Sequence, residues 1–181
     1  MMLSKHLAAP NEAALSHSSK LDGIHLTPHF SVAEFERSDR AKKLYKQTGD
    51  PVWLNRMPAS VRMNAVVLCE NVLEKVRAHF GMPIYISSGY RCTRLNAKVG
   101  GVTTSQHTKG EAADIYIMNR EMPLKAVCDW MVKHLDYDQI IWETRPNGSK
   151  WIHVSYVNPE RNRHKAMRCE DGKHYLPYKN S

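Results

Sequence analysis

The sequence predicts an α+β domain in which helices pack against a small, largely antiparallel sheet. Two long amphipathic stretches, several short runs with strand character and an Asn-Gly turn signal between two of those runs support this class. The chain has 181 residues, enough for one domain with a hydrophobic core and too few for two comfortable ones. We therefore expect a flexible N-terminal arm over residues 1–25 and a single domain over residues 26–181 that ends in a basic C-terminal tail.

Two long helices are predicted from the spacing of apolar residues. In residues 59–80, apolar side chains recur every three or four positions and so lie on one face of a helix. Pro58 suits the start of this helix, and Gly81 suits the position just after its end. Residues 124–135 repeat the same spacing and predict the second long helix.

Shorter elements are predicted on either side of the first long helix. Ser31 and Glu34 have the spacing of a capping box, which predicts a short helix through Arg37. Residues 38–57 are polar and contain turn signals, so we expect an irregular connection there. Residues 94–99 form another short helix candidate, which ends at a Gly-Gly pair.

Four strands complete the predicted order. Residues 83–88 and 112–117 are short apolar runs with β-branched and aromatic residues. Residues 138–143 and 151–157 have the same character, and the seven residues between them include an Asn-Gly pair, which predicts a hairpin. The order helix, strand, helix, strand, helix, strand, strand indicates helices packed against a largely antiparallel sheet.

The chain carries a formal net charge of +8 at pH 7, which favours an anionic partner: a cell-wall polymer, a membrane surface or nucleic acid. The cationic residues of the tail are Arg161, Arg163, Lys165, Arg168, Lys173 and Lys179. The tail lacks the regular aromatic residues of a nucleic-acid-binding platform, so no nucleic-acid partner is expected. A solvated basic surface is the alternative that charge alone leaves open.

No segment predicts membrane insertion or export. No apolar run approaches the ~20 residues that a transmembrane helix needs, so we expect no integral membrane protein. The N-terminal residues lack the apolar core of a secretory signal peptide. The cysteines are Cys69, Cys92, Cys128 and Cys169, which are widely spaced and form no CxxC pair. We expect reduced, mostly buried thiols and neither a zinc ribbon nor a disulfide framework.

Three residues form a candidate metal site. His107 precedes a glycine turn and Asp114 lies in the strand that follows, so the turn can bring both side chains to one ion. His153 lies in a later strand between apolar neighbours. Imidazole and carboxylate both bind Zn²⁺, and three protein ligands leave a fourth position for water, as in catalytic zinc sites. Because the chain has ten histidines, a core histidine without a metal is the competing interpretation.

Three stretches together carry a known signature. They are Ser88-Gly89-Tyr90-Arg91, Ser105 to Asp114, and Trp151-Ile152-His153-Val154-Ser155. They resemble the D-Ala-D-Ala carboxypeptidase family of zinc peptidases, which includes phage endolysins and has a signature similar to S-x-H-x-x-G-x-A-x-D with a later W-x-H. The fixed positions are matched by Ser105, His107, Gly110, Ala112, Asp114, Trp151 and His153. Residues 26–31 also resemble the opening of a phage-rich branch, so the resemblance covers about residues 26–157.

The resemblance implies the zinc-peptidase fold shared with the Hedgehog signalling domain and a single bound Zn²⁺. The implied metal ligands are His107, Asp114 and His153. Arg91 is expected to hold the developing oxyanion or a substrate carboxylate, because a guanidinium stays charged and has fixed donors. A surface ion pair is the alternative for Arg91. The expected substrate-binding residues are Ser105, Gln106 and Tyr90.

The role of general base is assigned to Glu143. Several branches of the family place an acidic residue three positions before the last histidine, but Lys150 occupies that position here. The hairpin brings Glu143 beside His153, and both face the metal only if the pairing register sends them to one side of the sheet. Glu111 is the second candidate, although a regular strand would turn it away from the metal. A surface carboxylate paired with Arg145 is the alternative for Glu143.

These features predict a monomeric, zinc-dependent peptidase that hydrolyses an amide bond in peptidoglycan stem peptides or cross-links. The cleaved bond stays open among D,D-carboxypeptidase, D,D-endopeptidase and L,D-endopeptidase activities. Without a signal peptide, we expect synthesis in the cytoplasm and action on the cell wall after release, in phage lysis or from a virion. The alternatives are a zinc-containing, non-catalytic cell-wall-binding module, which Lys150 favours, and a basic nucleic-acid-binding protein.

Overall fold

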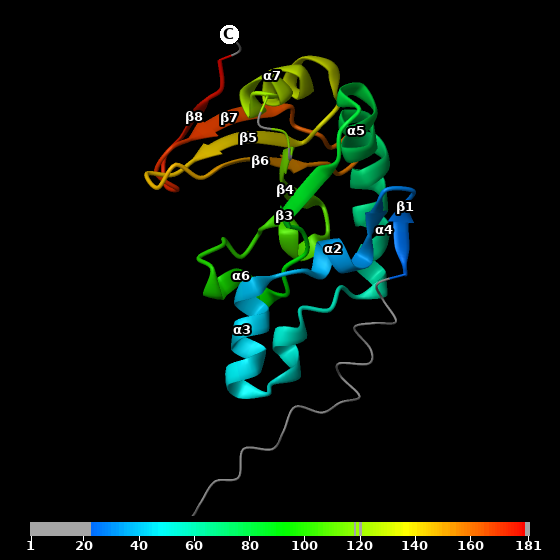
Figure 1. Ribbon diagram of the computed structural model, residues 1–181, viewed down its shortest axis with the longest axis vertical. Helices are drawn as coiled ribbons and strands as arrows, with labels where there is room; N and C mark the ends of the chain where they lie inside the picture. Colours follow the sequence, from blue (N-terminus) through cyan, green and yellow to red (C-terminus); the bar gives the residue numbers. More distant parts are fainter. Residues whose placement is uncertain (1–22, 118, 120, 180–181) are drawn as a thin grey trace, which may run out of the picture.

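The computed structural model describes residues 23–117, 119 and 121–179 and shows a mixed α+β domain, as predicted. A six-stranded, largely antiparallel sheet has the order β3-β4-β6-β5-β7-β8, and a small separate sheet pairs β1 (His25–Thr27) with β2 (Phe30–Ser31). In Figure 1 the α4–α5 rod stands along one side of the large sheet, and α7 lies over β5 and β6. Residues 1–22 of the predicted arm lie outside the described residues.

The strands of the large sheet confirm the predicted hairpin and add two further strands. Their bounds are β3 (Ile84–Ser88), β4 (Ala112–Ile117), β5 (Gln139–Thr144), β6 (Lys150–Ser155), β7 (Lys165–Cys169) and β8 (Tyr175–Pro177). Neighbouring strands are antiparallel except β5 and β7, which run parallel. The segment predicted as a basic tail therefore forms one edge of the sheet.

The long helix predicted over residues 59–80 is confirmed. It consists of α4 (Ala59–Leu68) and α5 (Glu74–Phe80), joined by the π-helical segment Cys69–Leu73. Gly81 follows its last residue in the left-handed conformation, with φ 62°. The second predicted helix corresponds to α7 (Leu124–His134). These helices bury apolar side chains in one core together with the inner face of the sheet.

The short elements include one prediction that was wrong. The capping box is present, since the Glu34 backbone N–H donates to Ser31 Oγ at 3.3 Å and begins α2 (Val32–Glu36). The helix predicted at residues 94–99 is α6 (Thr93–Lys98). The irregular connection predicted over residues 38–57 is the wrong prediction. This segment instead contains the helix α3 (Asp39–Thr48) and the 3₁₀ turn η1 (Pro51–Leu54).

The remaining predictions concern membrane spans and thiols. No helix in the described part of the chain is long and apolar enough to cross a membrane. All four cysteines are free, and Cys69, Cys128 and Cys169 are buried while Cys92 is half-buried. Burial raises the pKa of the Cys128 thiol to about 12, so this group stays protonated at neutral pH. The expectation of mostly buried thiols is confirmed.

Candidate metal centre

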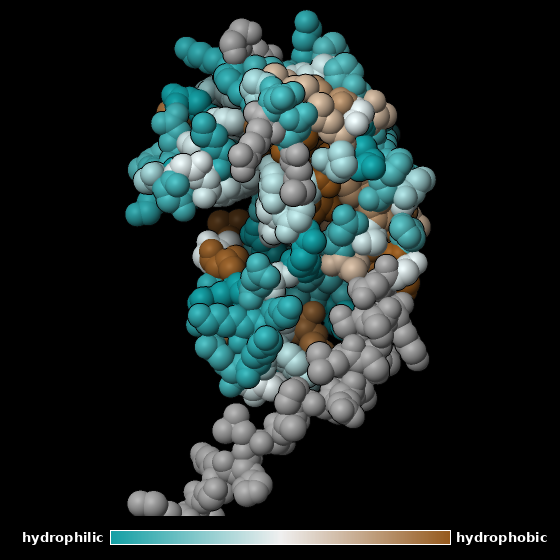
Figure 2. All heavy atoms as spheres, viewed as in Figure 1, coloured by the Kyte–Doolittle hydropathy of each residue, from teal (hydrophilic) through white to brown (hydrophobic). Residues whose placement is uncertain are grey.

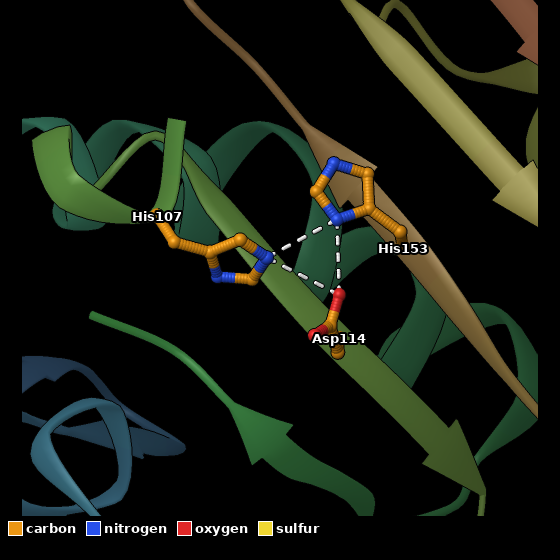
Figure 3. Close-up of side chains that lie close together, drawn as sticks. All are labelled: His107, Asp114 and His153. Carbon is orange, nitrogen blue, oxygen red and sulfur yellow. Dashed lines mark hydrogen bonds and ion pairs between the residues drawn. The ribbon is translucent and has the colours of Figure 1, made fainter. Parts of the chain in front are cut away.

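Sheet register brings two of the three predicted ligands together. Asp114 on β4 and His153 on β6 are direct partners in an antiparallel pair, so their side chains leave the same face of the sheet. His107 comes from the 3₁₀ turn η3 (Gln106–Lys109), which leads into β4. Figure 3 shows the three side chains pointing toward one another from these elements.

Gly110 lets the η3 turn pack closely against the first long helix. Its φ is +71°, a conformation that residues with a Cβ rarely adopt. A Cβ at this position would also lie 2.7 Å from the backbone oxygen of Val61 in α4. A glycine is therefore required at the point where the turn carrying His107 meets the helix.

The separations of the three candidate ligand atoms fit one metal ion. Asp114 Oδ1 lies 2.9 Å from His153 Nδ1 and 3.3 Å from His107 Nε2. The two imidazole nitrogens are 3.2 Å apart. Ligands bound tetrahedrally to zinc at about 2.0–2.2 Å lie about 3.3–3.6 Å from one another, so these atoms are slightly closer together than zinc-bound ligands would be. The two nitrogens and one oxygen thus form a donor set for one cation.

Neighbouring groups orient these ligands. His107 Nδ1 lies 2.7 Å from the Gly89 carbonyl oxygen, which can only accept, so Nδ1 donates and Nε2 keeps its lone pair for a metal. Arg91 Nη2 donates to Asp114 Oδ2 at 2.7 Å and leaves Oδ1 facing the histidines. Arg91 Nε also donates to Ser88 Oγ, which fixes the guanidinium beside the site.

Burial and neighbouring charges favour the protonation states of His107 and Asp114 that metal binding requires. His107, Asp114 and His153 are 3%, 8% and 9% exposed. Burial lowers the pKa of His107 and favours the neutral imidazole. Burial alone would raise the pKa of Asp114, but the charge and hydrogen bonds of the two histidines hold that pKa well below its ordinary value. Neutral imidazole and ionised carboxylate are the forms that bind metal.

A cavity of about 900 Å³ opens beside the three side chains and is lined by Arg91, His107 and His153, among others. Figure 2 shows the molecule hollowed at the left, between the part that contains β5 to β8 and the part that contains α6. The volume lies in the range of ligand pockets and accommodates a short peptide. The candidate metal site is thus accessible from solvent at one side.

The pairing register of the hairpin sends Glu143 and His153 to the same side of the sheet, which was the condition for Glu143 to face the metal site. Ile141 is the partner of His153 and Glu143 is two residues further along β5, so Glu143 and His153 face the same side of the sheet. Glu143 lines the cavity and is only 8% exposed. Burial raises its pKa, and the negative charge of Asp114 raises it further.

Glu143 also forms the ion pair considered as its alternative. Arg145 Nη2 donates to Glu143 Oε2 at 2.8 Å, and the Arg145 guanidinium lies over the Trp151 ring at 4.6 Å. The carboxylate is buried, however, and faces the cavity that contains the candidate metal ligands. An ion pair with Arg145 and a position in the cavity of the candidate metal site are therefore compatible.

The other predicted site residues occupy different positions. Ser105, Gln106 and Glu111 line the cavity. Glu111 immediately precedes β4 and lines the cavity, although the alternation of a regular strand was expected to turn it away from the metal. Tyr90 is a 7% exposed core residue outside the cavity lining, a position that does not favour its predicted contact with substrate. Lys150 is exposed at the start of β6.

Sequence reasoning missed Asp138 and the cavity residues that follow residue 155. Asp138 lines the cavity, is 1% exposed and is held by Arg163. The later residues were interpreted only as a basic tail. The β7 segment Lys165–Cys169 has no regular alternation of polar and apolar residues, so its residues carry no strand signal.

Two imidazoles and a carboxylate at the edge of an open cavity define a three-ligand site of the kind found in metal-dependent hydrolases. A sequence model of the Peptidase M15 family matches residues 28–155, most of the 181-residue chain. The chain therefore belongs to the Peptidase M15 family, and the resemblance to D-Ala-D-Ala carboxypeptidase-like peptidases is confirmed over these residues. No curated protein matches the chain significantly.

Proposed function

We propose that the protein is a zinc-dependent peptidase that hydrolyses an amide bond in peptidoglycan stem peptides or cross-links. The observation that carries the proposal is the convergence of His107, Asp114 and His153 beside a cavity that also contains Glu143. Membership of a peptidase family supports the reaction class. The proposed metal is zinc, because two imidazoles and one carboxylate suit it and three protein ligands leave a position open.

Zinc, when bound, polarises a carbonyl group and lowers the pKa of water. His107, Asp114 and His153 would hold the ion, while Glu143 takes a proton from the attacking water and returns it to the leaving amine. A carboxyl group whose pKa is raised above its ordinary value suits both transfers, since it holds an accepted proton more readily than an exposed carboxylate does. Arg91 donates to the oxyanion that develops on the carbonyl, because its guanidinium is fixed beside Asp114.

The proposed substrate and setting have separate support. A net charge of +8 suits an anionic cell-wall polymer, and the resemblance of residues 26–31 to a phage-rich branch supports action in phage lysis or from a virion. Mass spectrometry of peptidoglycan fragments digested by the metal-loaded protein tests the proposal. Fragments shortened at one amide bond are expected, and they identify the bond. Unchanged fragments from a zinc-loaded, folded protein would contradict the proposal.

A non-catalytic wall-binding module is the second candidate. Lys150 replaces an expected acidic residue, and Arg145 already pairs with Glu143, so both favour this candidate. Zymography on purified peptidoglycan separates the two functions. Clearing indicates a peptidase, whereas retention on the wall without clearing indicates a binding module.

A further inference from the structure

One wall of the cavity consists of residues beyond 155, where the match to the Peptidase M15 family ends. This C-terminal wall includes Arg163, Met167, Gly172, Lys173 and Tyr175. It is built on β7 and β8, which form one edge of the large sheet (Figure 1). The matched region supplies the candidate metal ligands, whereas this later segment shapes the space beside them.

The strand register places Tyr175 on the face of the sheet that carries the candidate site. Glu143 on β5 is the partner of Cys169 on β7, and Cys169 is in turn the partner of Tyr175 on β8. Paired residues extend to the same face, so Tyr175 and Glu143 both leave the face that carries His153. Neighbouring strands lie about 4.8 Å apart, which separates the backbones of Glu143 and Tyr175 by roughly 10 Å. Because Cys169 between them is small, the two longer side chains line the same part of the cavity.

The turn between β7 and β8 holds the start of β8 beside the proposed base. Asp171 Oδ1 accepts from the backbone N–H groups of the two residues before Tyr175, at 2.8 Å each. Gly172 in the same turn has a φ of +79°, and a Cβ added there would lie 3.2 Å from Arg145 Cζ. The turn therefore packs directly on the guanidinium that pairs with Glu143.

The hydroxyl group of Tyr175 is available to a ligand. Tyr175 is 49% exposed and lines the cavity, and its hydroxyl forms no hydrogen bond with any residue that the structure describes. Partial burial raises the pKa of Tyr175, and the negative charge of Glu143 raises it further, so the phenol stays protonated and can donate. The charge of Asp114 has the same effect, which agrees with a position near the candidate metal ligands.

We propose that Tyr175 is a substrate-binding residue of this site and that its hydroxyl donates a hydrogen bond to a backbone carbonyl oxygen of the peptide. This inference rests on the proposed function, since the cavity leads to the candidate peptidase site. A peptide presents a carbonyl oxygen at every residue, and a phenol is a neutral donor that suits such an acceptor. Tyr175 thus aligns the peptide, while Glu143 transfers the proton.

Tyr175→Phe tests this contact because it removes the hydroxyl and keeps the ring. With the zinc-loaded full chain and soluble peptidoglycan fragments, KM should rise by about three- to tenfold, the effect of one lost hydrogen bond. The value of kcat should change by less than about twofold, because a contact made equally in the ground and transition states affects binding alone. Zinc content and the midpoint of urea denaturation should match those of the unaltered protein.

Leu176→Ala is the matched control. Leu176 is the next residue of β8 and is 48% exposed, but strand alternation sends it to the opposite face, outside the cavity lining. It should leave KM unchanged.

Two results would refute the contact while the peptidase function stands. The first is an unchanged KM for Tyr175→Phe, and the second is an equal rise in KM for Leu176→Ala. A loss of zinc or of stability in Tyr175→Phe would also refute it, because the residue would then act on the structure and not on the substrate. If the zinc-loaded unaltered protein cuts no fragment, the proposed function fails and this inference fails with it.

Discussion

At the residue scale, Glu143 is buried, forms an ion pair with Arg145 and faces the cavity that contains the candidate metal ligands. The 8% exposure and the charge of Asp114 favour its neutral form, whereas Arg145 favours its ionised form. These opposing influences leave a carboxyl group that can exchange a proton during a reaction. Lys150 cannot take this role while it is protonated.

Glu143→Gln tests the assignment of the base. The amide preserves the shape but cannot accept a proton, so kcat should fall by about 10²–10⁴-fold while zinc binding persists. Steady-state assays on peptidoglycan fragments and zinc analysis measure the two effects. Glu111→Gln is the control, since Glu111 lines the same cavity, and it should cost much less. A larger loss for Glu111→Gln would reverse the assignment.

Arg145→Ala tests how the ion pair tunes this base. Removing the cation removes an influence that lowers the pKa of Glu143, so that pKa rises. Because the base must be ionised, kcat/KM should begin to fall at a higher pH as the solution is acidified. Arg168→Ala removes a cation that pairs with Glu170 outside the cavity, and its pH profile should match that of the unaltered protein. Coincident profiles for Arg145→Ala would separate this pair from catalysis.

At the element scale, the sequence predicted elements with strong periodicity or terminal signals. The apolar spacing of residues 59–80 and the Asn-Gly turn led to the correct helix and hairpin. The helix α3 was missed because its buried face within the domain consists of only Ala41 and Tyr45. The strand pairing of β7 with β5 depends on contacts distant in the chain, which local patterns do not encode.

The metal ligands of the candidate site could be predicted from the sequence, but the residues around them could be predicted only in part. The spacing of His107, Asp114 and His153 matched a family signature, and the structure brings these residues together. The direction of Glu143 depended on a register that the sequence left open and that the hairpin supplies. The C-terminal wall could not be predicted because its charged residues resemble an ordinary solvated surface.

Gly110→Ala tests the packing of the turn that carries His107. The added Cβ would meet the Val61 carbonyl oxygen at 2.7 Å, so the turn must move away from α4. Gly148→Ala is a matched control, because Gly148 also has a positive φ but nothing lies within 4 Å of its added Cβ. Urea denaturation should show Gly110→Ala to lower the free energy of unfolding by about 1–3 kcal/mol more than the control, with weaker zinc binding. Equal losses would show that the close approach is unimportant.

At the scale of the whole molecule, Asp138 joins the matched region to the C-terminal wall. Burial alone would raise its pKa, but hydrogen bonds from Arg163 outweigh burial and hold the pKa below the ordinary value. The ionised form therefore stabilises the fold above the pKa of an unfolded aspartate. This contribution is lost as the pH falls through the lower pKa of the folded state.

Asp138→Asn tests this connection. The variant should lower the free energy of unfolding by about 1–2 kcal/mol near neutral pH, because Arg163 is half exposed and solvent weakens the pair. The difference from the unaltered protein should shrink in acid, which denaturation at several pH values measures. Glu160→Gln, an exposed change, should have little effect. A difference that is constant with pH would argue against a charge-dependent anchor.

The whole account depends on the metal site, and zinc stoichiometry tests it most directly. Elemental analysis of purified protein, loaded with zinc and freed of unbound metal, should find about one zinc ion per chain. His107→Ala and His153→Ala should lose it while remaining folded by circular dichroism, because each removes one of three ligands. A folded wild-type chain without zinc, or full occupancy in both variants, would contradict the account.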